Sequence, residues 1–424
     1  MNIMVIGGGG REYGIARKLA EDPRVEKLFV LPGNGGMEEF AECVPIKATD
    51  LEGVCGFARE YEIGFAVVTP DDPLAMGLAD RLRELRIPCF GPSKAAARIE
   101  ASKVFSKRLM EKYGIPTAAA SAFDSLEDAL AYVNETLPPM VVKADGLALG
   151  KGVFICRTRD EAGSACRELM ENRLFGESGS RVLIEEFLEG PEVSVLSFTD
   201  GKTIVPMVSS MDHKTVFEGG RGPNTGGMGV IAPNPFYTES VAKECMERIF
   251  LPTVRAMENE GCPFSGCLYF GLMITANGPK VIEYNCRFGD PEAQTVLPLM
   301  ETNLLDAMLA CENGTLDKTP VRFSGRAAAN VVLVSGGYPG KYEKGLPIEL
   351  APDEEDVFTV HAGTKRTDSG YVTAGGRVLN VIAVADTLEE AIKKAYAQAE
   401  KTRFPSMFMR RDIGRAALDF IERG

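Results

Sequence analysis

Short apolar runs alternate with amphipathic segments over the first 100 residues. Residues 3–6, 28–31 and 65–69 are nearly continuous in apolar side chains, and each run ends at Gly or Pro. Apolar strands of this kind, separated by helices, are typical of a parallel sheet that is covered on both faces. The pattern therefore predicts a doubly wound α/β domain over residues 1–100, in which ligands would lie at the carboxyl ends of the strands.

Beyond residue 100 the periodicity changes. It predicts a helix from Ser102 to Lys112, which Gly114 and Pro116 would end. A small α/β domain is expected over residues 117–192. Its predicted elements are helices at 125–135 and 160–172 and strands at 140–143, 153–156 and 182–187.

Residues 193–325 predict a central α+β domain with longer strands, and residues 326–424 predict a small β-rich domain. In the central domain, 267–275 and 280–285 flank a turn sequence, which predicts an antiparallel hairpin. In the last domain, short apolar runs alternate with Gly-rich turns before a helix predicted at 387–401. The expected fold class is therefore α/β, built in four parts.

Composition narrows the class of protein. Hydrophobic residues make up 45% and charged residues 25% of the 424 residues, as in soluble globular proteins. No apolar run approaches the ~18 residues of a membrane span, and the N-terminus shows no secretory signal. The ten cysteines are scattered without a CxxC pair, so we expect reduced thiols in a cytoplasmic protein. With only two histidines, a zinc site built on histidine is not expected.

The net charge of -13 gives the chain as a whole no basic footprint for nucleic acid. We therefore expect small-molecule partners, with neither nucleic acid nor a membrane, and a monomer or weak homodimer. An anionic substrate would need local lysines, arginines and backbone N–H groups.

Four glycines, residues 7–10, follow the first predicted strand and precede a helix. Glycine lets the backbone approach a phosphate closely, and the helix N-terminus adds N–H donors. A dinucleotide fingerprint fails, because Glu12 stands where a third Gly belongs and no acid follows the second strand. We interpret Gly9, Gly10, Arg11 and Glu12 as a loop for a phosphorylated substrate; the alternative is a tight strand–helix turn.

Asp71 follows the third predicted strand in the sequence Thr-Pro-Asp-Asp-Pro. A carboxylate at that position could bind sugar hydroxyls. The alternative is an N-cap, because Asp at the N-cap with Pro73 at the first helical position is a common start.

Lys143 ends an apolar strand, where a lysine is costly to bury without a counter-charge, and phosphate oxygens are a natural partner. The loop that follows has three glycines and a second lysine, which predicts a flexible flap with N–H donors for β- and γ-phosphates. It is not a Walker A sequence, because Lys151 is followed by Gly152. The alternative is an ordinary hairpin loop. The loop residues singled out are Asp145, Gly146, Gly150, Lys151 and Gly152.

Glu185 and Glu186 end another predicted strand, and Glu192 follows. The backbone of an extended hinge there could bond adenine while a carboxylate binds the ribose hydroxyls; the alternative is a set of surface acids. Lys103, at a predicted helix start, could likewise be either a nucleotide contact or a surface residue.

Glu283 and Asn285 alternate along a predicted strand and so share one face, and Arg287 continues the alternation if the strand extends that far. Two oxygen ligands suit Mg²⁺, or Mn²⁺, which takes water and phosphate oxygens as its other ligands. A guanidinium can fork onto a carboxylate. The pattern therefore predicts a metal site beside an anionic substrate, against the alternative of a solvated strand.

Two further polar segments complete the set. Asp212, His213 and Lys214 are consecutive, and residues 222–229 form a long Gly-rich loop of a kind that exposes N–H groups to anions. His213 is either a proton carrier or a structural histidine.

Together these motifs resemble the ATP-grasp superfamily and, within it, the phosphoribosylamine–glycine ligase family of purine biosynthesis. The resemblance spans essentially the whole chain. It includes the segments 90–93, 285–292, 361–364 and 411–414. It implies the ATP-grasp architecture, in which residues 117–192 would be the lid over ATP.

The resemblance also implies a reaction. The carboxylate of glycine would attack the γ-phosphate of ATP and give glycyl phosphate and ADP. The amine of 5-phosphoribosylamine would then displace phosphate and form glycinamide ribonucleotide. The work of the enzyme would be positioning and charge neutralisation.

Roles carried over by position follow the same groups. Arg287 and Asp212, with Lys214, would act on glycine, and Glu283 and Asn285 would hold the metal ion. The nucleotide site would comprise Lys103, Lys143, Asp145, Gly146, Gly150, Lys151, Gly152, Glu185, Glu186 and Glu192. Substrate contacts would come from Gly9, Gly10, Arg11, Glu12, Asp71, Asn224, Thr225, Gly226, Gly289, Asp290 and Glu292.

Two positions depart from the family pattern. Tyr13 stands where the family has His, and Asp71 stands where it has Glu. Tyr cannot titrate near neutrality, and Asp is one methylene shorter, so the contacts to the amine substrate stay open. The chain stops after one ligase unit and so resembles the free-standing bacterial form.

Two alternatives remain at this stage. One is another ATP-grasp carboxylate–amine ligase or carboxylase, which would use formate or bicarbonate in place of glycine. The other is a nucleotide sensor without turnover, which has no need of the acid, amide and guanidinium at 283, 285 and 287.

Overall fold

The apolar runs of the first 100 residues form the predicted parallel sheet in the computed structural model of the chain, which describes residues 1–148 and 152–423. Five strands lie in the order β3-β2-β1-β4-β5. Their bounds are β1 Asn2–Gly7, β2 Lys27–Pro32, β3 Glu42–Cys43, β4 Ile63–Val68 and β5 Cys89–Phe90. The helices are α1 Gly10–Ala20, α2 Leu51–Glu60, α3 Asp71–Met76, α4 Leu78–Glu84 and α5 Lys94–Ala101.

Both faces of this sheet are covered, which explains why its strands carry no alternating pattern. Ile3 and Val5 pack in the cluster that includes residues of α1, whereas Met4 and Ile6 pack in the cluster that includes residues of α2, α3 and α4. All four side chains are fully buried. The carboxyl ends of β1 and β4 therefore open toward the rest of the molecule.

The helix α3 corrects the proposed cap at Asp71. Its N-cap is Pro70, so Asp71 is the first helical residue and Pro73 the third. The carboxylate of Asp71 accepts a hydrogen bond from the N–H of Asp72. A cap directly before Pro73 would have put Asp72 at the N-cap. That interpretation is wrong, because the helix begins two residues earlier than the position of Pro73 suggests.

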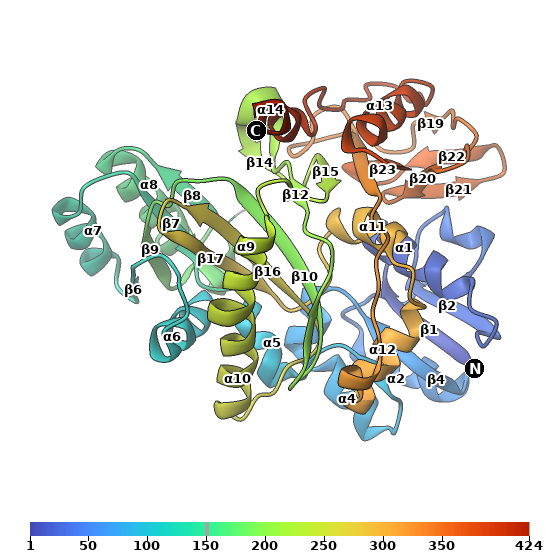
Figure 1. Cartoon of the computed structure of the whole chain (residues 1–424), viewed down its shortest axis with the longest axis horizontal. Coiled ribbons are helices and arrows are strands. Elements are labelled where there is room, and N and C mark those ends of the chain that lie inside the picture. Colours follow the sequence, from blue (N-terminus) through green and yellow to red (C-terminus); the bar gives the residue numbers. More distant parts are fainter. Residues whose placement is uncertain (149–151, 424) are drawn as a thin grey trace.

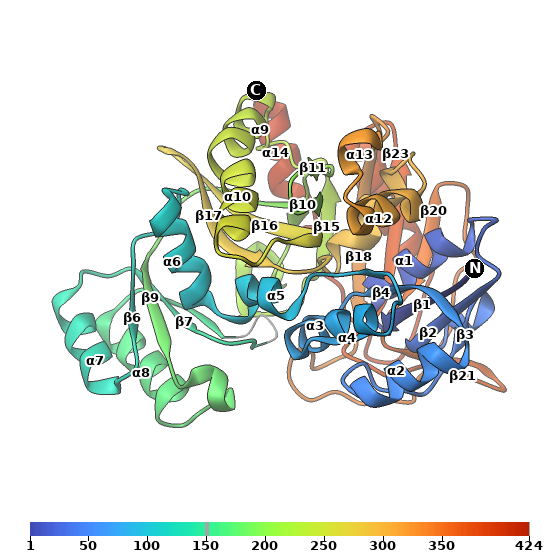
Figure 2. The ribbon, with the colours of Figure 1, turned by 90° about the horizontal axis from the view of Figure 1, so that it is seen from below.

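The helix predicted after Ser102 is α6, Lys103–Tyr113, and Ser102 caps it. It leads to a small antiparallel sheet in the order β6-β9-β7-β8, which two helices cover. Figures 1 and 2 show this part (teal) projecting from the rest of the molecule at one end. Its elements are β6 Ala120–Phe123, α7 Leu126–Glu135, β7 Met140–Ala144, β8 Val153–Cys156, α8 Arg159–Met170 and β9 Val182–Glu186.

The predicted hairpin is the centre of the third part. The strands β16 (Ser265–Thr275) and β17 (Gly278–Asn285) are antiparallel, and only Ala276 and Asn277 separate them. With β10 (Glu192–Asp200) and β11 (Ile204–Pro206) they form a sheet in the order β11-β10-β16-β17. The helices of this part are α9 Glu239–Cys245, α10 Leu251–Asn259, α11 Glu292–Val296 and α12 Leu304–Asn313.

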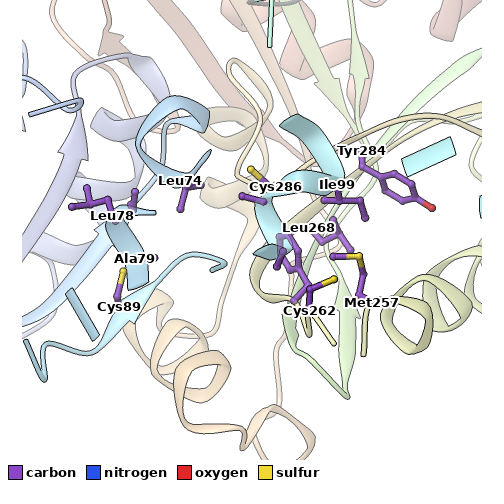
Figure 3. Packing of buried hydrophobic residues seen from close by; sticks show 14 of the residues in the cluster. Leu74, Leu78, Ala79, Cys89, Ile99, Met257, Cys262, Leu268, Tyr284 and Cys286 are labelled. Carbon is purple, nitrogen blue, oxygen red and sulfur yellow. The ribbon is translucent and has the colours of Figure 1, made fainter. Parts of the chain in front are cut away.

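One apolar cluster joins the N-terminal sheet to the central sheet. Figure 3 shows Leu74, Leu78 and Cys89 at one end of the view, and Ile99 with Leu268 at the other. The helix α5 contributes Ile99, which lies beside Leu268 and Tyr284 in this view. The carboxyl ends of the N-terminal strands are therefore fixed relative to β17.

The last sheet is shared between two regions that the sequence separates. Its order is β12-β15-β18-β23-β20, and β15 pairs with β18 in antiparallel register. The strands β12 (Met211–Asp212) and β15 (Gly229–Ala232) come from the segment assigned to the central domain. The other elements are β18 Ala327–Val334, β20 Val357–His361, β23 Arg377–Ala385, α13 Leu388–Ala399 and α14 Arg415–Arg423.

Two of these strands are longer than the short runs expected in the last domain. β18 has eight residues and β23 has nine. The glycine-rich turns lie at the ends of these strands, because Gly336 and Gly337 follow β18 and Gly375 and Gly376 precede β23. Smaller elements complete this part of the chain and the segment before it. These are the sheet of β19 Pro347–Ile348, β21 Thr364–Thr367 and β22 Gly370–Thr373, and the hairpin of β13 Thr215–Phe217 and β14 Arg221–Asn224.

All ten cysteines are free thiols, and every one except Cys43 is buried. No helix in the described part of the chain is long and apolar enough to cross a membrane.

Candidate active site

A polar cavity of about 330 Å³ lies where the four parts of the chain meet. This volume is in the range of small-ligand sites. Lining residues come from α1, α3, α5, α6, β7, β9, β12, β16, β17 and β23 and from the loops between them. The predicted site residues that line it are Arg11, Asp71, Lys103, Lys143, Gly152, Glu185, Asp212, Lys214, Gly226, Glu283, Asn285, Arg287, Asp290 and Glu292.

The wall formed by α6 and the small sheet carries a buried charge triad. Glu185 accepts from Lys143 at 2.6 Å and from Lys107 at 2.8 Å, and all three side chains are at most 5% exposed. Lys143 also donates to the carbonyl of Ile282, and Lys107 donates to that of Ala118. The counter-charge that Lys143 requires is therefore inside the protein, and was not found from the sequence.

The pKa shifts of this triad follow from sharing one carboxylate. Burial raises the pKa of Glu185, but Lys143 and Lys107 outweigh it and hold that pKa below its usual value. Burial lowers the pKa of Lys107, and the attraction of Glu185 only partly offsets this effect. The wall therefore keeps an excess of positive charge facing the cavity.

Part of the loop after Lys143 has a structural role. Asp145 accepts hydrogen bonds from the Ser102 hydroxyl at 3.0 Å and from the N–H of Val104 at 2.8 Å, so it fixes the start of α6. Lys103 donates to the carbonyl of Gly146 at 3.0 Å. Burial lowers the pKa of Lys103, against the attraction of Glu283. Gly150 and Lys151 lie outside the described residues.

Two of the predicted hinge acids are closer to the surface. Glu186 pairs with Lys280 at 2.8 Å and accepts from the N–H of Ala119. Glu192 pairs with Lys214 at 3.2 Å. Neither acid lines the cavity, in contrast to Glu185.

Glu283 and Asn285, at the end of β17, both line the cavity, as predicted from their alternation. Burial raises the pKa of Glu283, but Lys214 and then Lys143 and Lys103 outweigh it, so the carboxylate stays ionised. No group of three or more His, Cys, Asp or Glu side chains in the described residues could hold a metal by itself. One carboxylate and one amide at an open cavity nevertheless fit Mg²⁺, which keeps water and phosphate oxygens as ligands.

Arg287 and Asp212 each present a buried atom that has no protein partner within the described residues. These atoms are Nε of Arg287 and Oδ1 of Asp212. The other edge of the guanidinium pairs with Glu100 at 3.0 Å. Burial and Glu292 raise the pKa of Asp212 well above its usual value, so this carboxyl lacks a sufficient positive partner. An unpaired donor and an unpaired acid in one cavity suit a ligand with a carboxylate and an ammonium group.

Lys214 lies between two carboxylates, Glu192 at 3.2 Å and Glu283 at 3.6 Å. Glu192 and then Glu283 raise its pKa well above the usual value despite burial. Lys214 is therefore a permanent cation at the predicted metal position.

The N-terminal glycine loop approaches the 289–292 segment closely. A Cβ at Gly9 would lie 2.9 Å from the carboxylate of Asp290, and one at Gly10 would lie 2.7 Å from the amide of Gln294, so a larger residue would have to displace these side chains. Arg11 reaches the cavity and donates to the carbonyl of Phe288 at 2.8 Å.

Glu12 does not line the cavity. It accepts from the N–H of Gly9 at 2.7 Å, from Arg11 at 2.7 Å and from the hydroxyl of Thr69 at 2.6 Å. Its place in the sequence suggested a substrate contact, but its oxygens hold the loop from behind.

Tyr13 also lies away from the cavity. Its ring packs against Phe40 at 5.2 Å and against His361 at 5.8 Å between centroids. The departure from the family at this position therefore affects packing between α1 and the C-terminal domain.

The 222–229 segment brings one residue to the cavity. Gly226 lines it, whereas the hydroxyl of Thr225 donates to the carbonyl of Lys214 at 2.8 Å, so it fixes the backbone there. Asn224 lies in the β13–β14 hairpin and lines a separate hollow beside β8 and α8.

In the 289–292 segment, the hydroxyl of Tyr269 donates to Glu292 at 3.0 Å. Asp290 pairs with Arg377 at 3.2 Å, and Arg377 also donates to the carbonyl of Asp290 at 2.7 Å. Gly289 does not line the cavity; a Cβ there would lie 2.4 Å from Glu292.

The cavity residues that were missed from the sequence include Glu100, Lys107, Tyr269 and Arg377. Lys107 comes one helical turn after Lys103, and this i,i+4 spacing could have revealed it. Nothing near Arg377 suggests its role, because its partners Gly226 and Asp290 are distant in sequence.

The family comparison covers almost the whole chain. Models of phosphoribosylglycinamide synthetase match in order: the N domain at residues 1–100, the ATP-grasp (A) domain at 101–293 and the C domain at 328–416. The chain belongs to the phosphoribosylglycinamide synthetase family. Membership of this ATP-grasp family implies the use of ATP with a divalent metal ion.

Individual relatives agree with the family. The phosphoribosylamine–glycine ligase of Halalkalibacterium halodurans is 45% identical over 419 residues, 99% of this chain and 97% of the relative. That of Vibrio vulnificus is 45% identical over 425 residues, 99% of each. The crystal structure of the Thermotoga maritima phosphoribosylamine–glycine ligase superposes with a TM-score of 0.86 at 34% identity and covers 97% of this chain and 100% of that one.

A more distant likeness concerns the fold alone. Biotin carboxylase from Campylobacter jejuni superposes with a TM-score of 0.75 at 13% identity, over 96% of this chain and 92% of that one. This distant neighbour therefore shares the fold of the chain.

Replacing Glu185 by Gln should strongly destabilise the protein, because two buried lysines would lose their shared counter-charge. We expect the free energy of unfolding to fall by about 3 kcal/mol in urea titrations followed by circular dichroism. The neighbouring Glu186→Gln is the control, since its 44% exposed side chain makes a surface pair worth about 1 kcal/mol or less. Equal losses for both variants would contradict the triad as a stabilising unit.

Stability should also fall in mild acid through the two histidines. Burial lowers the pKa of both His213 and His361 to about 4, below the usual 6.5. Between pH 6.5 and 4 the unfolded chain therefore binds protons that the folded chain does not, so the stabilisation is complete above 6.5 and is lost as the pH falls. We expect a loss of roughly 2 kcal/mol per histidine by pH 5 in urea titrations. His361→Asn should give a shallower slope between pH 7 and 5, and an unchanged slope would refute the assignment.

Proposed function

We propose that the chain joins glycine to 5-phosphoribosylamine with ATP, through glycyl phosphate, and releases glycinamide ribonucleotide, ADP and phosphate. This is the reaction of de novo purine biosynthesis. The observation that carries the proposal is the 45% identity to phosphoribosylamine–glycine ligases over 99% of the chain. The cavity carries lysines for the phosphates, oxygen ligands for the metal ion, and an arginine and a carboxyl group for the amino acid, each on a different part of its lining.

The positive wall is proposed to receive the nucleotide. Lys143 and Lys107 share one carboxylate, so a triphosphate would supply the missing negative charge. Lys103, Gly146 and Gly152 lie beside them on the loop and at the start of α6. The same proposal extends to Gly150 and Lys151 of the flap.

Glu283 and Asn285 are the proposed ligands of the divalent ion, either Mg²⁺ or Mn²⁺. When bound, that ion would neutralise charge on the phosphates during transfer. Lys214, which pairs with Glu283, adds a second positive charge at the same end of the cavity. These residues hold and orient phosphate oxygens and do not themselves exchange protons.

Arg287 and Asp212 are the proposed glycine site. The free Nε of Arg287 would bind the glycine carboxylate, and the orphan Oδ1 of Asp212 would bind its ammonium. The ammonium would then stabilise the ionised form of Asp212, which burial and the nearby Glu292 disfavour. Fixing both ends of glycine would aim a carboxylate oxygen along one direction.

The amine substrate is proposed to lie between the N-terminal loop and the 226 and 290 segments. Arg11, Asp71, Gly226 and Asp290 line that end of the cavity. Further contacts to the amine substrate are proposed to come from backbone groups or neighbouring side chains of Gly9, Gly10, Asn224, Thr225, Gly289 and Glu292.

We also propose the domain division 1–100, 117–192, 193–325 and 326–424, with α6 as the connection. Ten free cysteines suit a reducing cytoplasm. The net charge of -13 suits small-molecule partners over nucleic acid, and a monomer or weak homodimer is proposed.

Release of ADP tests the reaction when each substrate is omitted in turn. We expect sustained ADP release only with ATP, glycine and 5-phosphoribosylamine together, because the acyl phosphate forms on glycine and is consumed by the amine. Glycinamide ribonucleotide should appear in equal amount by mass spectrometry. Turnover with formate or bicarbonate, and none with glycine, would instead indicate another ATP-grasp ligase or carboxylase.

Replacing Arg287 by Lys should impair the use of glycine, because an ammonium cannot keep the pair with Glu100 and also offer the donor that Nε of the guanidinium provides. We expect the KM for glycine to rise at least roughly tenfold, or about 1.4 kcal/mol, with the KM for ATP nearly unchanged. Arg83→Lys is the matched control, since Arg83 also makes a forked pair, with Glu312, outside the cavity. A parallel rise in both KM values for Arg287→Lys would show that the assignment is wrong.

A further inference from the structure

The segment Asp212–Lys214 presents alternate side chains to two different surroundings. Asp212 and Lys214 line the cavity, whereas His213 between them does not. In an extended chain neighbouring side chains point to opposite sides, so the imidazole lies behind the cavity wall. The function proposed above uses Asp212 and Lys214 and gives no role to His213.

Both nitrogens of His213 are occupied by backbone groups. Nδ1 lies 3.1 Å from the carbonyl of Gly229, to which it donates, and Nε2 accepts from the N–H of Gly414 at 3.0 Å. This pairing requires the neutral ring with its proton on Nδ1. The imidazole therefore bridges β15 and the C-terminal segment, and it is not available as a proton carrier.

The segment that meets the imidazole is residues 410–414, here named the strap. It is fastened to α13, because the hydroxyl of Tyr396 donates to the carbonyl of Arg410 at 2.8 Å and accepts from the N–H of Ile413 at 2.9 Å. Figure 1 shows this end of the chain (red) lying over β14 and close to β12.

The strap also grips the chain just after Lys214. Arg410 donates to the carbonyl of Thr215 at 3.0 Å and forms a two-pronged pair with Asp412 at 2.7 and 2.8 Å. The same Asp412 accepts from the N–H of Gly219 at 2.8 Å. Arg410 is 4% exposed, so these bonds are shielded from water. Two independent contacts therefore hold the stretch that contains Asp212 and Lys214.

The geometry at Gly414 is specific to this contact. Its φ is +78°, a conformation that other residues rarely adopt, and a Cβ there would lie 2.4 Å from Ile392. A glycine at this position lets the backbone N–H turn toward His213. An alanine would be strained at this φ and would crowd the side chain of Ile392, so we expect it to disturb the contact of the strap with the imidazole.

We infer that His213 is a positioning residue: held by the strap, it fixes Asp212 and Lys214 in the cavity against the amino-acid substrate. The strand β12 has only two residues, and beyond it the backbone of His213 still pairs with the next strand: its N–H donates to the carbonyl of Gly229 at 2.9 Å and its carbonyl accepts from the N–H of Met228 at 2.9 Å. The imidazole adds the side-chain link between this stretch and the strap. A small displacement of Asp212 would misplace the ammonium group of the substrate, and misplacement of that kind is costly in catalysis. The inference rests on the proposed function, because it assumes that Asp212 binds glycine.

Three substitutions of His213 separate its two bonds. His213→Gln keeps an acceptor for Gly414, His213→Asn keeps only a donor toward Gly229, and His213→Leu keeps neither. We expect the KM for glycine to rise roughly tenfold in the Asn and Leu variants and much less in the Gln variant, as for other residues that orient a ligand from behind. The KM for ATP should stay within about twofold of the wild-type value.

Gly414→Ala tests the same contact from the strap. It should raise the KM for glycine by a similar factor, and the double variant with His213→Asn should be no worse than the worse single variant, because both changes break one bond. Additive effects would overturn the inference. If His213→Asn fails to fold, Gly414→Ala compared with the wild type still tests the inference. A rise in the KM for glycine without a rise in the KM for ATP would support it, and no such difference would overturn it.

Val357→Ala is the control for general loosening of the C-terminal domain. Val357 is buried in the core of that domain and makes no bond to the strap, so its loss should lower the melting temperature and leave the KM for glycine unchanged. An equal rise in KM for Val357→Ala would overturn the inference. Wild-type turnover with glycine is measured in the same assay. If it is absent, the proposed function fails; if it is present and the His213 variants behave as wild type, only the positioning role fails.

Discussion

The sharing of one buried carboxylate by two lysines is the interaction on which the cavity depends. Glu185 can neutralise only one of Lys143 and Lys107, so the wall of α6 and the small sheet keeps net positive charge. The lining formed by β17 and α11 carries the carboxylates of Glu283 and Glu292. A polyanion bound with a divalent cation would place negative charge beside the lysines and positive charge beside the carboxylates. Without such a ligand, neither set of charges is balanced.

The loops that face the cavity are fixed from behind by polar residues. Glu12 holds the glycine loop, Asp145 holds the start of α6, and Thr225 holds the backbone at Lys214. Each bond fixes a loop segment to a neighbouring helix or strand. The result is a preorganised set of donors and acceptors, which costs less to bring into position when a ligand binds.

The sequence was a good guide where a local pattern decides the structure. The parallel sheet, the hairpin ending in Glu283 and Asn285, and the helix after Ser102 all follow from periodicity and turn chemistry. Alternation along β17 also placed those two side chains at the cavity correctly.

It was a poor guide where partners are distant along the chain. The counter-charge of Lys143 comes from Glu185, and Asp290 is held by Arg377, and no local spacing connects either pair. Polar residues in conspicuous motifs were read as ligand contacts, but Glu12 spends its oxygens on the protein itself. From sequence alone, a brace and a ligand contact look the same, because both require a polar side chain beside a glycine.

The sheet shared by β12, β15 and β18 limits how this chain can be divided. Cutting the polypeptide between β17 and β18 would leave β15 with an unpaired edge in one fragment and β18 with an unpaired edge in the other. The central and C-terminal parts therefore depend on each other for a complete sheet. Two separate fragments would each expose backbone groups that are free to pair with another chain.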